Sequence, residues 1–203
     1  AKYMMITGDK AYSPQNANDM KDITNPNNKN GEMVKVVLIS KAGSEGLDFK
    51  FIRQVHVLEP WYNMNRIEQV IGRGVRNLSH CMLPFEERNV EIYLHATNPV
   101  NETETADLYV YRYAEKKAIQ IGKITRILKE TAIDCILNIG QTDLTIEKLN
   151  ALVENQTIKM KLSSNQEIDY KIGDKNGSGI CDYMNCDFVC SPNTTIESTD
   201  INE

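Results

Sequence analysis

Three side chains along one short stretch of the chain could bind phosphate groups. Gln69, Arg73 and Arg76 fall within roughly 60° of one another on a helical projection at about 100° per residue. A guanidinium group keeps its charge and offers a planar fork of N–H donors that matches phosphate oxygens. The apolar residues of the stretch gather on the opposite side: Met64, Ile67, Val70 and Ile71. The pattern predicts a helix over about 63–76 that packs on one face and presents an amide and two guanidinium groups on another.

Two glycines lie inside this predicted helix. Gly74 falls on its apolar side and Gly72 between the two faces. A glycine in a helix interior costs about 1 kcal/mol relative to alanine, so we expect a packing or close-approach reason for both. Taken alone, the stretch is also compatible with a surface helix that carries stray arginines.

A second group of candidate binding residues follows the apolar run that ends at Ser40. Gly43 and Gly46 allow a backbone path that other residues resist, and they let N–H groups approach a ligand closely. The hydroxyl of Ser40 and the carboxylate of Asp48 add polar groups, and a carboxylate suits the hydroxyls of a sugar. By itself the spacing is also typical of an ordinary turn between a strand and a helix.

The elements that must position these residues alternate along the chain. Apolar or β-branched runs predict strands at 3–6, 34–40, 54–58 and 90–95, and the run 34–40 has the composition of a strand covered on both faces. Helices are expected at about 16–22 and 63–76. This alternation predicts an α/β fold with a parallel sheet, whose ligands gather at the carboxyl ends of the strands. The loop 40–48 lies at that edge.

Composition limits the possible partners and environment. The net charge of −5 excludes a generally basic protein that coats nucleic acid, but not a local basic stripe. No run approaches the roughly 18 apolar residues that a membrane span needs, and no signal peptide is evident, so we expect an intracellular protein without a membrane. Five cysteines, an odd number, favour a reducing compartment.

The longest helical pattern runs from about 105 to 137, with Gly122 as a point where the helix could bend or divide. Its predicted apolar side is formed by Val110, Ala114, Ile121, Ile124 and Leu128. A basic stripe on another side contains Lys116, Lys123 and Arg126. Such a stripe could follow a phosphate backbone, or it could be only a solvated face.

The tail after residue 138 changes character. Alternating residues at 156–162 and 167–172 predict a β-hairpin. Cys181, Cys186 and Cys190 could begin a zinc site, but a fourth ligand is missing. The sequence therefore favours free or buried thiols over zinc.

The loop 40–48 followed by Gln69-x-x-Gly-Arg-x-x-Arg76 resembles motifs V and VI of superfamily-two helicases, which lie in the second RecA-like domain. Residues 55–68 are similar to helicases of large nucleocytoplasmic DNA viruses, among them the poxvirus early transcription factor small subunit and nucleoside triphosphate phosphohydrolase I. The resemblance is close over 3–99 and fair to residue 138. It implies an N-terminally truncated RecA-like domain at 1–100, a helical extension at 101–140 and a small accessory region at 141–203.

The resemblance also implies roles for the candidate phosphate-binding residues. Arg76 would be the arginine finger that reaches the γ-phosphate of ATP bound by the first RecA-like domain. Arg73 would support the same phosphates, and Gln69 would position the nucleotide or the attacking water. The nucleotide and its ribose would face Gly46, Asp48 and Gly72. The nucleic-acid backbone would lie near Ser40 and Lys41, with the basic stripe as a further contact.

The chain lacks a Gly-x-x-x-x-Gly-Lys-Ser/Thr phosphate loop and an Asp-Glu pair for magnesium. We therefore expect that the first domain, which would hold ATP and Mg²⁺, was removed or belongs to another chain. The expected function is that of a second motor domain of a helicase or translocase acting on DNA or RNA, with the viral transcription machinery as partner. The alternative is a non-hydrolysing binding or interaction module that retains the fold.

Overall fold

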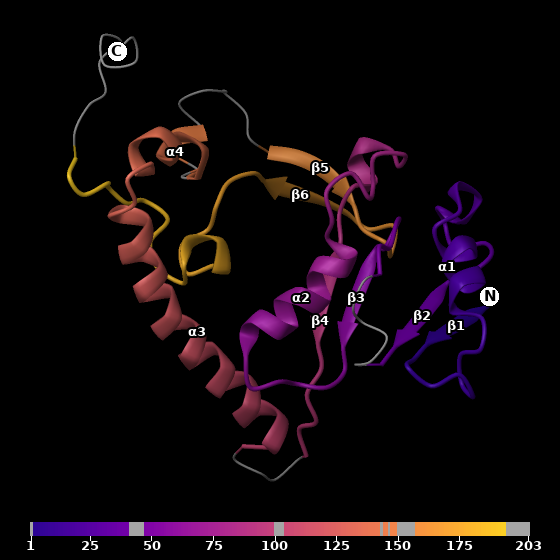
Figure 1. Ribbon diagram of the computed structural model, residues 1–203. Coiled ribbons are helices and arrows are strands. Elements are labelled where there is room, and N and C mark those ends of the chain that lie inside the picture. Colours follow the sequence, from indigo (N-terminus) through magenta and orange to yellow (C-terminus); the bar gives the residue numbers. More distant parts are fainter. Residues whose placement is uncertain are drawn as a thin grey trace. The chain divides into compact units, whose positions relative to one another are not determined.

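The computed structural model describes residues 2–40, 47–99, 104–142, 144–145, 147–149 and 157–193 (Figure 1). The chain forms two compact units, and each is described by itself. The first unit contains Ala1–Trp61, Asn65–Asp107 and Lys159–Asp169. The second contains Tyr62–Met64, Leu108–Ile158 and Tyr170–Glu203. The division into three regions at residues 100 and 140 stays a prediction.

The first unit is built on parallel strand pairs, as the sequence predicts. Strand β1 (Tyr3–Ile6) pairs with β2 (Val36–Ile39), and β3 (Gln54–Val57) pairs with β4 (Glu91–Leu94). The helix α1 (Asn16–Ile23) lies between β1 and β2 in the chain, and α2 (Met64–Gly74) lies between β3 and β4. The α/β class is confirmed. One difference is that the described strands form two separate two-stranded ladders and not one continuous sheet.

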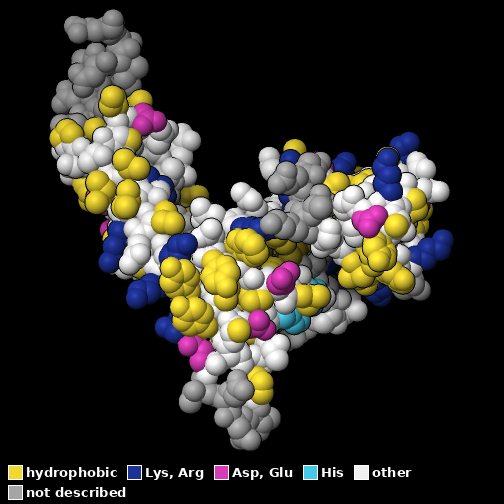
Figure 2. Space-filling view, turned by 60° about the horizontal axis from the view of Figure 1, so that its bottom comes forward, with side chains coloured by type: hydrophobic (Ala, Val, Ile, Leu, Met, Phe, Trp, Pro, Cys, Tyr) yellow, Lys and Arg dark blue, Asp and Glu magenta, His cyan; other side chains and the backbone are white. Residues whose placement is uncertain are grey.

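The core of the first unit differs from the expectation at one strand. The run 34–40 was expected to be covered on both faces, but Val36 is 50% exposed and Leu38 is 42% exposed. The reason is that β2 belongs to a ladder of only two strands, so little of its surface is covered. Apolar side chains accordingly reach the surface in several patches (Figure 2). The buried cluster consists of Ile6, Ile23, Val34 and Phe49, with Leu47 among the residues packed against it.

The predicted hairpin is present. Strands β5 (Thr157–Lys161) and β6 (Glu167–Lys171) pair with each other across a turn. The turn residue Ser163 donates its backbone N–H and its hydroxyl to the carboxylate of Glu91, with an N···O distance of 3.0 Å. These bonds from Ser163, together with one from Tyr93, hold the pKa of Glu91 below its usual value. The hairpin turn is therefore fastened to β4.

The long helical pattern folds as two helices, α3 (Ala106–Glu130) and α4 (Cys135–Thr142). The break lies just after α3, where the hydroxyl of Thr131 bonds to the carbonyl of Ile127 at 2.7 Å, and not at Gly122. None of the described helices is long and apolar enough to cross a membrane.

The predicted apolar side of α3 is largely wrong. Of its members Ala114 is fully buried, but Ile121, Ile124 and Leu128 are 50–65% exposed. The buried side is instead a stripe of mostly small residues spaced by four, which lets another segment of backbone approach the helix: Ala114, Ala118, Gly122 and Arg126. Small residues that let a backbone segment approach a helix do not stand out as a run of large apolar residues in the sequence, which explains the error.

The cysteines are paired, which corrects two expectations. Cys135 is bonded to Cys190, and Cys181 is bonded to Cys186. The predicted free thiols, and equally the three-thiolate zinc candidate at Cys181, Cys186 and Cys190, are therefore wrong, because these sulfurs are oxidised. Only Cys81 is a free cysteine among the described residues.

Candidate nucleotide-facing site

Helix α2 presents its polar side chains as the sequence predicts. Ile67 is 2% exposed and anchors the helix on the first unit, while Gln69 and Arg76 are exposed and Arg73 is half-buried. The apolar residues recur at the helical period, so they form one stripe that packs on the core, and the polar residues lie on the remaining surface of the helix. Gln69 and Arg73 therefore project from α2 away from Ile67, whereas the helix ends at Gly74, two residues earlier than expected, and Arg76 lies just beyond its end.

The two arginines converge on the loop that follows β2. Arg73 Nη1 donates to the carbonyl oxygen of Leu47 at 3.3 Å, and Arg76 Nη1 donates to the same oxygen at 3.4 Å. Arg73 and Arg76 lie 26 and 29 positions after Leu47 in the sequence. The fold thus brings Leu47 together with Arg73 of α2 and with Arg76, which lies just after that helix.

Asp48 is placed at this point by its two neighbours. Leu47 and Phe49 pack on the core cluster, so the residue between them is turned outward. Its carboxylate forms an ion pair with Arg76, with an Oδ1–Nε distance of 3.3 Å. Both side chains are about half exposed, 45% for Arg76 and 62% for Asp48. A pair this exposed contributes no more than about 1 kcal/mol, so Arg76 can leave Asp48 at small cost.

For the other predicted site residues the structure shows fewer contacts or none. Ser40 is exposed directly after β2, and its N–H donates to the carbonyl of Ile6 at 3.1 Å. Lys41 and Gly46, like Gly43, lie outside the described residues. Gly72 is exposed, and a side chain added there would meet nothing within 4 Å. The nucleotide-binding and nucleic-acid-binding roles of these residues stay predictions.

Two contacts that sequence reasoning missed hold α2 in position. His80 bonds through Nε2 to the carbonyl of Ile52 at 2.7 Å, and through Nδ1 to the hydroxyl of Ser79 at 2.7 Å. At the other end, the guanidinium of Arg66 lies 4.1 Å from the ring centre of Trp61. No motif signals either contact, because each depends on where the flanking loops run. The first contact ties the segment after α2 to Ile52, and the second ties the first turn of α2 to Trp61.

The two glycines of α2 give a matched test of this packing. A Cβ at Gly74 would lie 2.5 Å from Val55 Cγ2 and 3.1 Å from Ile52 Cγ2, whereas one at Gly72 would lie in open space. We expect Gly74→Ala to lower the free energy of unfolding by about 1–3 kcal/mol through overpacking. Gly72→Ala should raise it by up to about 1 kcal/mol through helix propensity. Urea titrations followed by circular dichroism measure both, and equal shifts of the same sign would contradict this packing.

The predicted basic stripe on α3 is only partly available. Lys116 and Lys123 are exposed. Arg126 is 5% exposed and forms an ion pair with Asp182, with an Nε–Oδ2 distance of 3.1 Å. The guanidinium of Arg126 is therefore covered in this structure, and its role as a nucleic-acid contact stays a prediction. The sequence could not signal this, since the partner lies 56 residues away.

Comparison with known proteins gives the family of the first unit. Residues 2–77 match the family described as "Helicase conserved C-terminal domain". The chain is 32% identical over 172 residues to the termination factor NPH-I homolog of African swine fever virus, which covers 79% of this chain. It is 29% identical over 194 residues to "Putative helicase 087L" of Invertebrate iridescent virus 3, covering 94% of this chain. It is 41% identical over 118 residues to "Putative ATP-dependent RNA helicase R350" of Acanthamoeba polyphaga mimivirus, covering 55% of this chain.

The chain spans only part of these relatives, 24%, 17% and 14% of their lengths in the same order. The family match covers both arms of the candidate site, since Leu47 and Asp48 as well as Gln69, Arg73 and Arg76 lie within residues 2–77. Residues 2–77 therefore belong to the helicase C-terminal domain family, and the chain is related to the helicases of large DNA viruses.

Proposed function

We propose that this chain supplies the second motor domain of an ATP-dependent helicase or translocase that acts on nucleic acid in viral transcription. The observation that carries the proposal is the convergence of Arg73 and Arg76 on Leu47 and Asp48. Two permanent cations beside a carboxylate suit a nucleoside triphosphate, whose phosphates bind guanidinium groups and whose ribose hydroxyls bind a carboxylate. The relatives named for ATP-dependent helicases and for NPH-I support this assignment.

In the proposed mechanism, Arg76 acts on the transferred phosphoryl group. Phosphoryl transfer spreads negative charge over the transferred oxygens, and a guanidinium that arrives there when the two motor domains close stabilises the transition state. The weak ion pair with Asp48 leaves Arg76 free to make that movement. Arg73 is held more firmly, since it is half-buried, and it would bind the same phosphates throughout the cycle. Gln69 would orient the nucleotide or the attacking water.

The residues of this chain fit the nucleotide but not its metal. Asp48 offers oxygens for the hydroxyls of a ribose, and the open space at Gly72 admits a ligand close to the backbone. The chain has no phosphate loop or acidic pair for Mg²⁺, so these belong to the other motor domain. Mg²⁺, when bound there, neutralises charge on the phosphates. The proposed role of this chain is to bring Arg73 and Arg76 to the phosphates.

On the nucleic-acid side, we propose contacts from Ser40, Lys41, Lys116 and Lys123. Lys116→Glu combined with Lys123→Glu should reduce the salt dependence of binding to a single-stranded oligonucleotide. Loss of two phosphate contacts lowers the magnitude of the slope of log K against log salt by about 1.4. An unchanged slope would mean that these lysines are only a solvated face.

The enzymatic proposal is tested by nucleic-acid-stimulated ATP hydrolysis in the complete protein. Hydrolysis that rises on addition of DNA or RNA supports the motor domain. Absence of hydrolysis, with nucleic-acid binding intact, would favour the non-hydrolysing module.

A further inference from the structure

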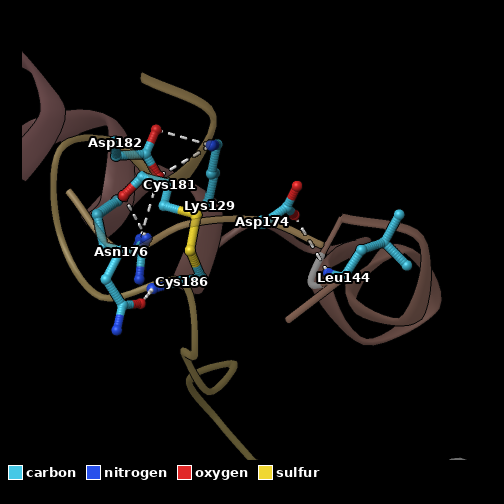
Figure 3. Close-up of a disulfide and its surroundings, with 8 residues drawn as sticks. Lys129, Leu144, Asp174, Asn176, Cys181, Asp182 and Cys186 are labelled. Atoms are coloured by element: carbon cyan, nitrogen blue, oxygen red, sulfur yellow. Dashed lines mark hydrogen bonds and ion pairs between the residues drawn. A yellow bond between two sulfur atoms is a disulfide. The ribbon is translucent and has the colours of Figure 1, made fainter. Parts of the chain in front are cut away.

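The carboxylate of Asp182 forms ion pairs with two cationic side chains of α3. Asp182 accepts from Arg126 Nε at 3.1 Å. It also accepts from Lys129 Nζ at 2.7 and 2.9 Å (Figure 3). Asp182 is 6% exposed and Arg126 5%, so the guanidinium is covered, whereas Lys129 remains 40% exposed. The arrangement places an anion on the basic side of the helix, where a phosphate of nucleic acid would otherwise bind.

Asp182 belongs to a segment that we call the cap, residues 176–191. Its only described regular structure is a short 3-10 helix, Gly179–Cys181. The cap is seated closely on α3, since the carbonyl of Asp182 contacts Gly122 and the guanidinium of Arg126 lies 4.7 Å from the ring centre of Phe188. Hydrogen bonds also lie within the cap, such as the one from the N–H of Gly177 to the carbonyl of Met184 at 2.8 Å.

Several attachments join the cap to the rest of the second unit. Besides the ion pairs of Asp182, Arg126 Nη2 donates to the carbonyl of Cys181 at 2.8 Å, and Lys148 pairs with Asp187 at 3.3 Å. The disulfide Cys181–Cys186 closes a loop inside the cap, and the disulfide Cys135–Cys190 ties the end of the cap to the start of α4. The backbone N–H of Ser191 donates to the carbonyl of Glu130 at 2.6 Å. The Cys135–Cys190 bond spans 55 residues and is the disulfide that links the cap to another segment of the second unit.

We propose that the cap is a redox-released shield over part of the nucleic-acid-binding face of α3. With the Cys135–Cys190 bond intact, Asp182 takes the place of a nucleic-acid phosphate on Arg126 and Lys129. With the bond reduced, the cap leaves, and Arg126 and Lys129 add two exposed cations to those of Lys116 and Lys123 on α3. This inference rests on the proposed nucleic-acid-binding role of that helix.

The chemical step is ordinary thiol–disulfide exchange with a dithiol. A thiolate of the dithiol attacks one sulfur of the Cys135–Cys190 bond, which breaks and leaves a mixed disulfide. The second thiol of the reagent then closes its own disulfide. The two cysteine sulfurs each end as a thiol after taking a proton, and the dithiol is oxidised by the two electrons that the protein gains. A reducing environment therefore favours the open cap, and an oxidising one the closed cap.

The test compares the oxidised 203-residue chain with the same chain treated with dithiothreitol, without denaturant. Binding of a fluorescent single-stranded oligonucleotide is measured across salt concentrations, and amide hydrogen exchange is measured over residues 176–191. We expect exchange in the cap to accelerate on reduction. We expect the salt slope to steepen by about 1.4, the value for two added phosphate contacts.

Matched variants separate the shield from the binding face. Arg126→Gln with Lys129→Gln should abolish the gain on reduction, and Cys135→Ser with Cys190→Ser should show the gain without reductant. Cys81→Ser should leave the response intact, because Cys81 is exposed and unpaired. If instead the Lys116→Glu, Lys123→Glu chain binds as tightly as the wild type, the proposed binding face fails, while cap exchange still reports on the shield.

Four results would overturn the shield. They are a Cys135–Cys190 bond that dithiothreitol does not reduce in the native chain, a reduced chain whose cap exchange is unchanged, an open cap with an unchanged salt slope, and a loss of the helical circular dichroism of α3 on reduction. The last would mean that the cap is simply part of the fold.

Discussion

Replacing Arg76 by alanine in the complete protein should lower the turnover number for ATP hydrolysis by about 10³-fold or more, by analogy with the arginine fingers of GTPases. The guanidinium is the charge that the proposed mechanism brings to the transferred phosphoryl group, and Arg73, which shares the Leu47 carbonyl with it, is the more buried of the two and is expected to stay in place. Steady-state turnover at saturating ATP and nucleic acid measures the effect.

The stability of the variant is the internal control. The ion pair that Arg76 makes with Asp48 is half exposed, so its loss should cost no more than about 1 kcal/mol of unfolding free energy. Arg76→Lys keeps the charge but loses the planar fork, and its turnover should fall between those of the wild type and the alanine variant. Near-normal hydrolysis by Arg76→Ala would rule out the arginine-finger role.

Gly122→Ala should lower the free energy of unfolding of the second unit by about 3 kcal/mol, the upper end of the usual cost of overpacking. The added Cβ would overlap the carbonyl oxygen of Asp182 and lie 2.9 Å from its carbonyl carbon. Because the obstacle is backbone, it cannot rotate away as a side chain can. The same change should push the cap from α3, and urea unfolding with hydrogen exchange over 176–191 measures both effects.

Gly140→Ala is the matched control in α4. A Cβ there would meet nothing within 4 Å, so the substitution should be neutral or stabilise by up to about 1 kcal/mol through helix propensity. If Gly122→Ala proves as harmless as Gly140→Ala, the close contact between the cap and α3 is absent in solution.

The sequence was sufficient for the strands and helices of the first unit. The helical period around Ile67 predicted that Gln69 and Arg73 would be turned away from the core. The alternation of strands and helices predicted the parallel pairing of the strands. Both inferences depend on periodicity within a few residues and on a general rule for parallel strands, which need no knowledge of distant contacts.

Contacts between distant segments were not predictable in the same way. Arg126 looks like a surface cation in its own helix, and only Asp182, 56 residues later, makes it a buried one. The cysteine pairing could not be read from spacing either, since Cys190 pairs with Cys135 across 55 residues and not with a cysteine of its own cluster. The exposed side of β2 reflects a two-stranded ladder, which the composition of the run 34–40 does not reveal.

The most direct test of the central claim is a structure of the complete protein with Mg²⁺, ADP and aluminium fluoride, which imitates the transferred phosphoryl group. We predict that the Arg76 guanidinium will have left Asp48 and will donate to the fluoride ligands, with Arg73 bound to the adjacent phosphate oxygens. A complex with the two motor domains closed on the nucleotide, in which Arg76 still pairs with Asp48 and makes no contact with the fluoride, would contradict it.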